Sequence, residues 1–359
     1  MSPRENPFAD HLQRSWFRPP WAPASQDDST PVRWALAALT VAYRLAWAAR
    51  EAWSRVFPPR TAPRGVRIIA IGNLIVGGAG KTPCALAVAQ ALSDAGIACG
   101  FISRGYRSEA EFHGPVVVLP QDLSQTMPAR IGDESWLLSW RTGLPIAVGK
   151  NRWQCLEALL AAQPRLRAVI LDDGLQQRTL ACDEQILVID ERGFGNGQCL
   201  PAGPLREPIG DLSRFRHTVH RGRELTVKPG GWLQVAALAS GLHTHHELID
   251  LAAGIQRFAG RRILAAAGIA EPQRFFNDLR GLGLSFESLP LADHDTGLAQ
   301  VLQQRWQTGH YDVLLMTEKD AVKFFNKRLD VCNHAWALRQ EPQLDPTLTS
   351  RLINGFETA

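Results

Sequence analysis

Residues 66–94 read VRIIAIGNLIVGGAGKTPCALAVAQALSD, and their order of patterns indicates the fold class. Residues 66–73 form a short apolar run rich in β-branched residues, which predicts a buried strand. A glycine-rich loop follows, and beyond it apolar residues recur at helical spacing. Strand, glycine loop and helix in this order are typical of a phosphate-binding loop. We therefore expect an α/β fold built on a P-loop NTPase-like parallel sheet.

The loop supplies several groups that bind phosphate. Its three glycines let consecutive backbone N–H groups curl around an anion, Lys81 adds positive charge for the β and γ phosphates, and the Thr82 hydroxyl can ligate Mg²⁺. The strict pattern G-x-x-x-x-G-K-[ST] requires a glycine where this chain has Ile75, so the loop is a variant of the GGxGKT kind. The alternative is a glycine-rich turn with an incidental Lys-Thr pair. The agreement of strand, loop and helix favours ATP or GTP binding by Gly77, Gly78, Ala79, Gly80, Lys81 and Thr82.

A second strand is predicted to end in carboxylates. Residues 166–174 read LRAVILDDG, and the apolar AVIL segment predicts a buried parallel strand. Asp172 and Asp173 then lie at its carboxyl end, where open α/β sheets bind their ligands. Adjacent carboxylates are unfavourable without a nearby cation, which suggests Mg²⁺. The alternative is an Asp-Asp-Gly turn with solvated acids.

The first sixty residues differ in composition from the rest. Five of the eleven tryptophans lie within residues 1–53, interleaved with arginines. From Trp34 to Tyr43 the chain is apolar except for Thr40, but Arg44 ends the run well short of the roughly 20 residues that cross a bilayer. No signal peptide is predicted, because this run starts too late in the chain. We expect a membrane-associated helix in the headgroup region; the alternative is an amphipathic helix packed on its own domain.

Composition excludes several classes of protein. The 359 residues are 45% hydrophobic, enough for one large or two ordinary domains. The 39 basic and 35 acidic residues balance too evenly for a chain that coats nucleic acid, so no nucleic-acid partner is expected. The six cysteines are scattered without a C-x-x-C pair, which excludes a zinc knuckle or disulfide framework and fits a cytoplasmic setting.

Further polar clusters follow predicted strands or open helices, and none of them identifies an acceptor by itself. They are SRGY at 103–106, GDE at 132–134, Asn151-Arg152, and PAGPLREP at 201–208. Together with the phosphate loop they resemble the tetraacyldisaccharide 4'-kinase family of lipid A biosynthesis. The similarity runs in order through IGNLIVGGAGKTP, SRGY, GDE, LDDGLQQR, GNGQCLPAGPLREP, ADHD and MTEKDAVK, and so spans most of the chain.

This resemblance implies an ATP-dependent kinase with Mg²⁺ as its cofactor. Its acceptor is the 4'-hydroxyl of a membrane-bound, tetraacylated glucosamine disaccharide 1-phosphate. The family's catalytic pair maps to Asp133, which would accept the hydroxyl proton, and His294, which would orient or tune it, with Lys81 on the phosphates. The implied substrate contacts are Arg104, Tyr106, Arg152, Arg206 and Glu207, and the implied metal ligands are Thr82, Asp172 and Asp173.

From the residues alone, Asp133 also fits a helix-start acid, and His294 also fits a surface or capping histidine. Two departures from the family pattern stand out. Where the family usually reads DDGFQHR, this chain has Leu175 for the aromatic residue and Gln177 for the histidine, so any contact of that histidine is weakened or replaced. Where a second histidine often follows the first in the late motif, this chain has Asp295.

The chain divides by pattern into four segments. Residues 1–60 hold the membrane-interface helix and linker, and 61–225 the P-loop kinase domain. Strand and helix patterns restart beyond 225, which predicts a second, smaller α/β lobe over 226–340. Residues 341–359 form a C-terminal segment expected to pack back on the kinase domain.

Two other functions fit part of this pattern. A membrane-associated P-loop switch or partition-type ATPase would also use a GGxGKT loop and an amphipathic helix, and a catalytically silent lipid-binding scaffold would use the same features. The ordered motifs favour the kinase. We expect it at the cytoplasmic face of the bacterial inner membrane, peripheral or monotopic, with the acylated disaccharide and the membrane surface as partners and no obligate protein partner.

Overall fold

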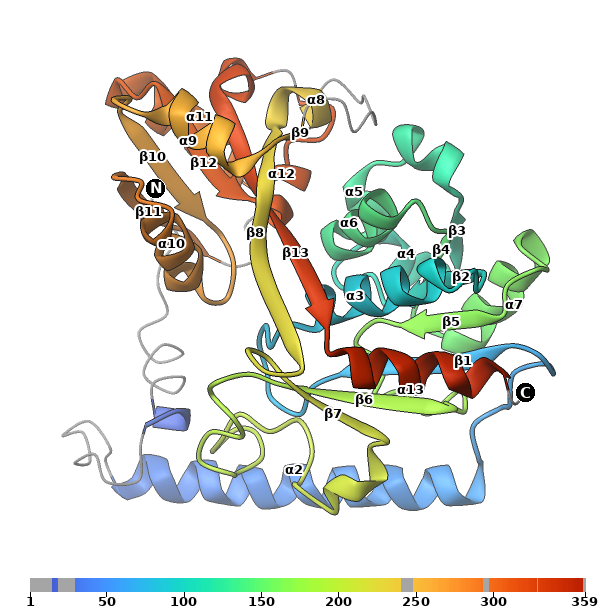
Figure 1. Cartoon of the computed structure of the whole chain (residues 1–359). Coiled ribbons are helices and arrows are strands. Elements are labelled where there is room, and N and C mark those ends of the chain that lie inside the picture. The colour runs from blue at the N-terminus through green and yellow to red at the C-terminus, as the bar shows by residue number, and fades with distance from the viewer. Residues whose placement is uncertain (1–14, 19–29, 240–247, 293–296, 328, 358–359) are drawn as a thin grey trace.

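The computed structural model describes residues 15–18, 30–239, 248–292, 297–327 and 329–357. Its described residues form two β-sheets with helices packed on them, together with a long helix that lies along one side (Figure 1). We call the seven-stranded sheet the large sheet and the six-stranded one the small sheet. The mixed α/β class with largely parallel sheets is as predicted.

The large sheet has the order β3-β4-β2-β5-β1-β6-β7, and every pairing is parallel except that of β3 with β4. Residues of β1 alternate between two apolar clusters, as the pleat of a strand buried on both faces requires. Helices α3 and α6 pack on the face of Ile69, and α7 packs on the face of Ile68. The strands are β1 (Arg67–Gly72), β2 (Cys99–Ser103), β3 (Val116–Val118), β4 (Ile146–Val148), β5 (Ala168–Leu171), β6 (Glu184–Ile189) and β7 (His217–His220).

The connections of the large sheet carry its helices. The strand-loop-helix unit predicted over 66–94 is confirmed, because α3 begins directly after the glycine loop that follows β1. The helical elements are α3 (Lys81–Asp94), α4 (Glu109–His113), η1 (Pro120–Gln125), α5 (Pro128–Ile131), α6 (Asp133–Thr142), α7 (Arg152–Ala162) and η2 (Leu212–Arg214).

The small sheet has the order β11-β10-β12-β13-β8-β9. Its first four strands are parallel, whereas β8 runs antiparallel to both of its neighbours. The restart of strand and helix patterns beyond residue 225 is confirmed by its buried strands and the helix between them. The elements are β8 (Leu225–Gln234), α8 (Val235–Ala239), β9 (Leu248–Ile249), α9 (Leu251–Phe258), β10 (Ile263–Ala267), α10 (Pro272–Gly281), β11 (Glu287–Pro290), α11 (Leu298–Gly309), β12 (Val313–Thr317), α12 (Glu318–Val322), η4 (Asp330–His334) and β13 (Ala335–Leu344).

The long antiparallel pair β8 and β13 reaches from the small sheet toward the large one (Figure 1). After β13 the chain forms α13 (Pro346–Glu357), which packs against α3 of the large sheet. Two arginines of the large-sheet region bind the carboxyl end of α13: Arg67 donates to the carbonyl of Gly355, and Arg167 donates to that of Phe356. The chain therefore returns to its first sheet at the carboxyl terminus.

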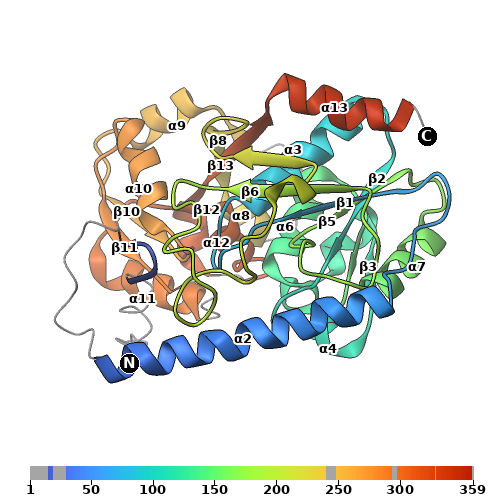
Figure 2. The same cartoon turned by 90° about the horizontal axis from the view of Figure 1, so that it is seen from below.

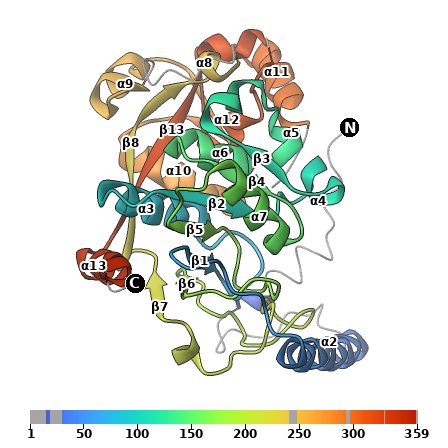
Figure 3. The ribbon, with the colours of Figure 1, turned by 90° about the vertical axis from the view of Figure 1, so that its right-hand side faces the viewer.

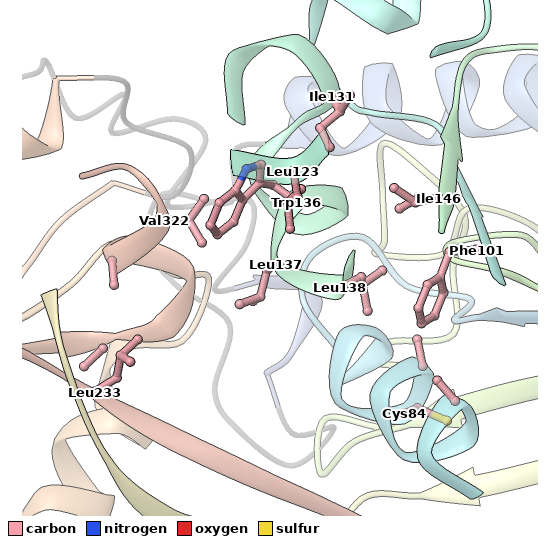
Figure 4. Packing of buried hydrophobic residues seen from close by; sticks show 14 of the residues in the cluster. Cys84, Phe101, Leu123, Ile131, Trp136, Leu137, Leu138, Ile146, Leu233 and Val322 are labelled. Atoms are coloured by element: carbon pink, nitrogen blue, oxygen red, sulfur yellow. The ribbon is translucent and has the colours of Figure 1, made fainter. Parts of the chain in front are cut away.

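Helix α6 lies between the two sheets. Leu138 points toward Phe101 of the large sheet, whereas Trp136 points toward the side of α12 (Figure 4). The ring of Trp136 lies 4.8 Å from that of Phe325. Arg141, near the end of α6, donates two hydrogen bonds of 2.7 Å to the Glu318 carboxylate at the start of α12. Both side chains are buried, so the contact between the sheets combines an apolar cluster with an enclosed ion pair.

The long helix is α2 (Thr30–Val56), and it lies apart from both sheets (Figures 2 and 3). Its contacts with the rest of the chain include polar ones: the Tyr43 hydroxyl donates to the Arg206 carbonyl at 2.5 Å, and Thr40 accepts from the Ala202 amide at 3.0 Å. Much of its apolar surface is exposed. Among the described residues, none of the helices combines the length and apolar character that a bilayer-crossing segment needs.

The buried pair of Arg141 and Glu318 predicts a large effect on stability. Glu318→Ala leaves the guanidinium buried without its carboxylate, which is expected to lower the free energy of unfolding by about 3 kcal/mol. Arg305→Ala is the matched control, because Arg305 and its partner Glu287 are both about half exposed. That control should cost less than about 1 kcal/mol. Equal urea midpoints for the two variants would contradict the assignment.

Candidate active site

The loop after β1 turns through two glycines with positive φ. Gly77 and Gly80 have φ of 93° and 87°, in the left-handed region that side chains other than glycine disfavour. Gly80 is the N-cap of α3 and offers no side chain to its free N–H groups, and the first turn of α3 has no acidic residue. The positive end of the helix dipole is therefore available to a bound anion.

Lys81 is held over this loop by three oxygen atoms. Its ammonium donates to the Asn73 side-chain oxygen at 3.1 Å and to the Gly77 carbonyl at 3.5 Å, and lies 3.6 Å from a carboxylate oxygen of Asp173. Asn73 is fully buried, and its amide donates to the Ile75 carbonyl at 2.8 Å. Asn73 was not predicted as a site residue, because in the sequence it is simply a polar residue at the end of a buried strand.

Asp172 and Asp173 lie at the carboxyl end of β5, as predicted, but their surroundings differ. Asp173 is 37% exposed and accepts two hydrogen bonds of 2.9 Å from Arg206. Desolvation opposes its ionisation, yet the positive charges of Lys81 and Arg206 prevail and hold the pKa of Asp173 below its usual value. Asp173 is therefore a carboxylate that is already paired with cations.

Asp172 is buried, and its Oδ1 atom accepts no hydrogen bond from any described residue. Burial, followed by the negative charges of Glu134 and Asp173, raises the pKa of Asp172 to about 7. A buried carboxylate oxygen without a donor is a group that a divalent cation would satisfy. Among the described residues, no group of three or more His, Cys, Asp or Glu side chains is arranged to hold a metal ion by itself. One or two carboxylates with phosphate oxygens suffice for Mg²⁺.

Two further motifs meet beside these acids. Helix α6 begins at Asp133, directly after Gly132. A methyl group built on Gly132 would lie 3.4 Å from the Cα atom of Gly105, so the GDE and SRGY turns are in contact. Glu134 pairs with Lys319 from the small sheet at 2.9 Å. Asp133 thus starts a helix whose first turn adjoins the buried carboxylate.

The predicted substrate contacts divide into accessible and buried groups. Arg104 and Tyr106, after β2, are both more than half exposed, and the Arg104 guanidinium donates to Glu111 at 2.7 Å. Arg152 is buried at the start of α7 and donates to the Gly149 carbonyl at 2.6 Å. Burial lowers the pKa of Arg152, and the charges of Asp173 and Asp172 oppose that shift.

Glu207 is also buried, in the loop beneath α2. It accepts from the Gln176 amide at 3.1 Å and pairs with Arg214 at 3.1 Å. The same Gln176 amide donates to the Asn73 carbonyl at 3.0 Å. Glu207 therefore supports the segment before the phosphate loop from behind, a role that Gln176 shares and that sequence analysis did not predict for either residue.

Arg192 binds the outer side of the loop, and it was not predicted from the sequence. Its guanidinium donates to the Gly78 carbonyl at 2.6 Å and pairs with Asp190 at 2.7 Å, after β6. It also pairs with Glu271 at 2.8 Å, in the turn after β10 of the small sheet. Arg192 therefore links Glu271, in the turn after β10 of the small sheet, to the Gly78 carbonyl of the loop.

The remaining expectations concern His294 and the two replaced residues of the family pattern, Gln177 and Leu175. His294 lies outside the described residues. Gln177 closes its own turn: its Oε1 accepts from the amides of Thr179 and Leu180 at 2.9 Å, and its Nε2 donates to the Leu180 carbonyl at 2.6 Å. Leu175 is buried, and a methyl on Gly72 would meet its side chain at 2.7 Å. Leu175 and Gln177, which replace the aromatic residue and the histidine of the family pattern, thus serve as a packing residue and a turn residue, whereas Asp295 lies outside the described residues.

The carboxyl edge of the large sheet therefore has the features of an α/β enzyme that binds a phosphorylated ligand. Residues 32–357 match the sequence profile of the LpxK family, described as tetraacyldisaccharide-1-P 4'-kinase. The chain belongs to this family, which confirms the resemblance drawn from its ordered motifs. Its activity is accordingly the ATP-dependent 4'-phosphorylation of a tetraacyldisaccharide in lipid A synthesis.

Individual relatives are similar over nearly their whole length. The tetraacyldisaccharide 4'-kinase of Dechloromonas aromatica (strain RCB) is 37% identical over 349 residues, covering 96% of this chain and 97% of the relative. That of Herminiimonas arsenicoxydans is 36% identical over 350 residues, covering 93% and 91%. The crystal structure of "apo" form LpxK from Aquifex aeolicus in complex with ATP is similar in fold, with a TM-score of 0.71 at 22% identity over 90% of this chain and 99% of that one.

The bonding of Gln177 predicts that this residue serves folding more than catalysis. Gln177→Ala removes hydrogen bonds that close the turn, and should lower the free energy of unfolding by about 1 to 2 kcal/mol. The maximal rate should stay within about twofold of the wild-type rate, because the bonds face the turn. Gln90→Ala, on the exposed surface of α3, is the control. A large fall in rate without loss of stability would show that Gln177 acts in the reaction.

Proposed function

We propose that the transfer takes place at the carboxyl edge of the large sheet, in a P-loop NTPase-like site. There the γ-phosphate of ATP passes to the 4'-hydroxyl of a tetraacylated glucosamine disaccharide 1-phosphate. The observation that carries this proposal is the position of Lys81, 3.6 Å from Asp173 and at the start of a helix whose N–H groups are uncapped. A cation and free amide donors at one point are what a triphosphate requires.

The loop at 77–82 would bind the triphosphate, with Lys81 on the β and γ phosphates. Asp172 and Thr82 would hold Mg²⁺, and the partnerless oxygen of buried Asp172 fits that ligand. Each oxygen of Asp173 accepts one hydrogen bond from Arg206 and keeps a second lone pair with which it would support the same cation. When bound, Mg²⁺ supplies charge neutralisation on the phosphate oxygens.

Asp133 would accept the proton of the attacking hydroxyl. Phosphoryl transfer asks mainly for positioning, with one carboxylate to take that proton. Its place at the start of α6, whose next residue contributes to the field at Asp172, puts it beside the proposed phosphate site. Arg104 and Tyr106 are accessible enough to contact the disaccharide. Arg152 and Glu207 are buried and would act indirectly: Arg152 by its positive charge near the two acids, and Glu207 by holding the backbone of the site.

His294 would act from the small sheet, and the strand register supports this. β10 and β11 are parallel and end together, with Ala267 opposite Pro290. The turn after β10 contacts the phosphate loop, because a methyl on Gly78 would lie 3.7 Å from Ala270. His294 follows the end of β11 by four residues in the sequence and lies outside the described residues. We propose that residues 61–225 and 226–340 act as two lobes that close over the substrates.

Helix α2 would bring this site to the cytoplasmic face of the inner membrane, where the acylated acceptor lies. Trp34, Leu45 and Trp53 are 72%, 66% and 66% exposed. Arginines on the same helix, among them Arg44, are exposed as well. Exposed aromatic and aliphatic side chains with interspersed arginines suit a headgroup region better than water. The chain would thus be peripheral or monotopic.

The role of Asp133 is tested by Asp133→Asn. With γ-labelled ATP, Mg²⁺ and the lipid disaccharide, the wild-type enzyme should place the label on the lipid. The variant should lose about 100-fold or more in kcat, because general base catalysis contributes roughly that factor. Its KM for ATP should change little. A variant that keeps its kcat but binds ATP poorly would instead show a structural acid at the helix start.

Membrane docking is tested on the exposed face of α2. Trp34→Ser with Trp53→Ser should reduce cosedimentation with vesicles of anionic phospholipid, because each change removes a large apolar group from the headgroup region. Phosphorylation of a water-soluble, deacylated acceptor should be unaffected. Val301→Ser is the control, since α11 lies at the opposite end of the molecule from α2 (Figures 1 and 3). Unchanged vesicle binding of the double variant would exclude α2 as the docking surface.

A further inference from the structure

A group of charged residues lies at the carboxyl ends of β6 and β7, on the opposite side of β1 from Asp172 and Asp173. The strand order β5-β1-β6-β7 places it there. Most of these residues are paired: Arg192 with Asp190 and Glu271, and Arg274 with Glu191 and Glu271. The pairs link the strand ends of the large sheet to the small sheet.

Arg221 is the exception in this group. It follows β7 directly, and its backbone amide bonds to the Ile189 carbonyl at 2.8 Å. Its side chain is half-buried, yet the guanidinium makes no hydrogen bond or ion pair with any described residue. A guanidinium has five donors and is poorly placed in such surroundings without an acceptor.

The side chain of Arg221 lies against the phosphate loop. A methyl group built on Gly80 would come 3.4 Å from its Cδ atom and 3.7 Å from its Nη1 atom. Gly80 is the residue before Lys81, at the start of α3. The unpaired guanidinium therefore borders the point at which the helix N-terminus would receive phosphate oxygens.

The direction of the bound triphosphate follows from the charges on either side of β1. Lys81 and Asp173 lie 3.6 Å apart on the β5 side, which marks the end where the γ-phosphate and its metal belong. The α-phosphate and the nucleoside must then extend the other way, over β6 and β7. Arg221 stands on that path.

The charges around Arg221 leave this cation without a paired anion among the described residues. Burial lowers its pKa, and the positive charge of Arg274 adds to this effect. The carboxylates of Glu191, Asp278 and Asp190 oppose the shift, but none of them pairs with Arg221. A phosphate would supply the missing charge and acceptors, and the planar guanidinium also stacks well on aromatic rings.

We propose that Arg221 binds the nucleoside end of ATP, with its guanidinium on the α-phosphate and against the purine ring. This assignment rests on the proposed placement of the triphosphate in the loop at 77–82. Arg221 would hold the part of the nucleotide that is not transferred. Its contribution should therefore be equal for ATP and for ADP.

The test uses the full-length protein with Arg221→Met, which keeps most of the side-chain length and removes the charge. The KM for ATP and the Kd for ADP should both rise about tenfold or more, as expected for loss of a charge-assisted hydrogen bond. The kcat at saturating ATP should stay within about twofold, because the transferred group is not contacted. Arg223→Met is the matched control, since Arg223 lies two residues further along and is 76% exposed.

Unchanged ADP affinity in a folded Arg221→Met protein would overturn the assignment, and so would a fall in kcat with normal ADP binding. If the methionine variant does not fold, Arg221→Lys replaces it and should weaken ADP binding about threefold or more, because an ammonium lacks the planar donor fork. Lys81→Ala in the same assay separates the two claims. If it binds ATP normally, the loop placement fails; if it loses ATP while Arg221→Met does not, only the present inference fails.

Discussion

Two adjacent carboxylates at the end of a buried strand can coexist only when cations surround them, and this requirement organises the carboxyl edge of the large sheet. Asp173 draws Lys81 and Arg206 toward β5, and buried Arg152 adds its charge to the field at both acids. One oxygen of Asp172 accepts no hydrogen bond from the part of the chain that the structure describes. The negative charge of the two acids is unfavourable in the protein alone, and the same charge favours the binding of a metal ion together with a phosphate chain.

Helix α6 connects this edge to the small sheet. Its first residue is the proposed base, and its last turn carries the buried pair with Glu318. Lys319, the next residue of α12, pairs with Glu134 in the first turn of α6. Glu318 and Lys319 of the MTEKDAVK motif thus bind the helix that bears Asp133. Any movement of one sheet relative to the other would therefore displace or strain the contacts at both ends of α6.

Much of the site could be predicted from sequence because its parts are local. The strand before the phosphate loop, the helix after it and the acids after AVIL are each encoded by a few consecutive residues, and parallel strands bring their carboxyl ends to one edge. Burial could not be predicted in this way. Arg152 and Glu207 are charged residues next to or within predicted loops, where exposure to solvent is expected. Both are buried, because segments distant in the chain cover them.

Residues with a single polar signal were missed for the same reason. Asn73, Arg192 and Arg221 each end or follow a strand, and nothing in their neighbours along the chain shows that they meet at one loop. The helix α2 could be predicted because its signals are local. The apolar run from Trp34 to Tyr43 indicates a helix, and an alanine-rich segment of high helix propensity continues it to Val56.

The most direct measurement of the central claim is a crystal structure of the protein with a non-hydrolysable ATP analogue and Mn²⁺, located by its anomalous signal. The account predicts the triphosphate in the loop at 77–82, with Lys81 on its β and γ phosphates. The metal should lie between those phosphates and Asp172, within reach of Thr82. A nucleotide bound elsewhere, or a metal that does not contact the β5 acids, would contradict the account.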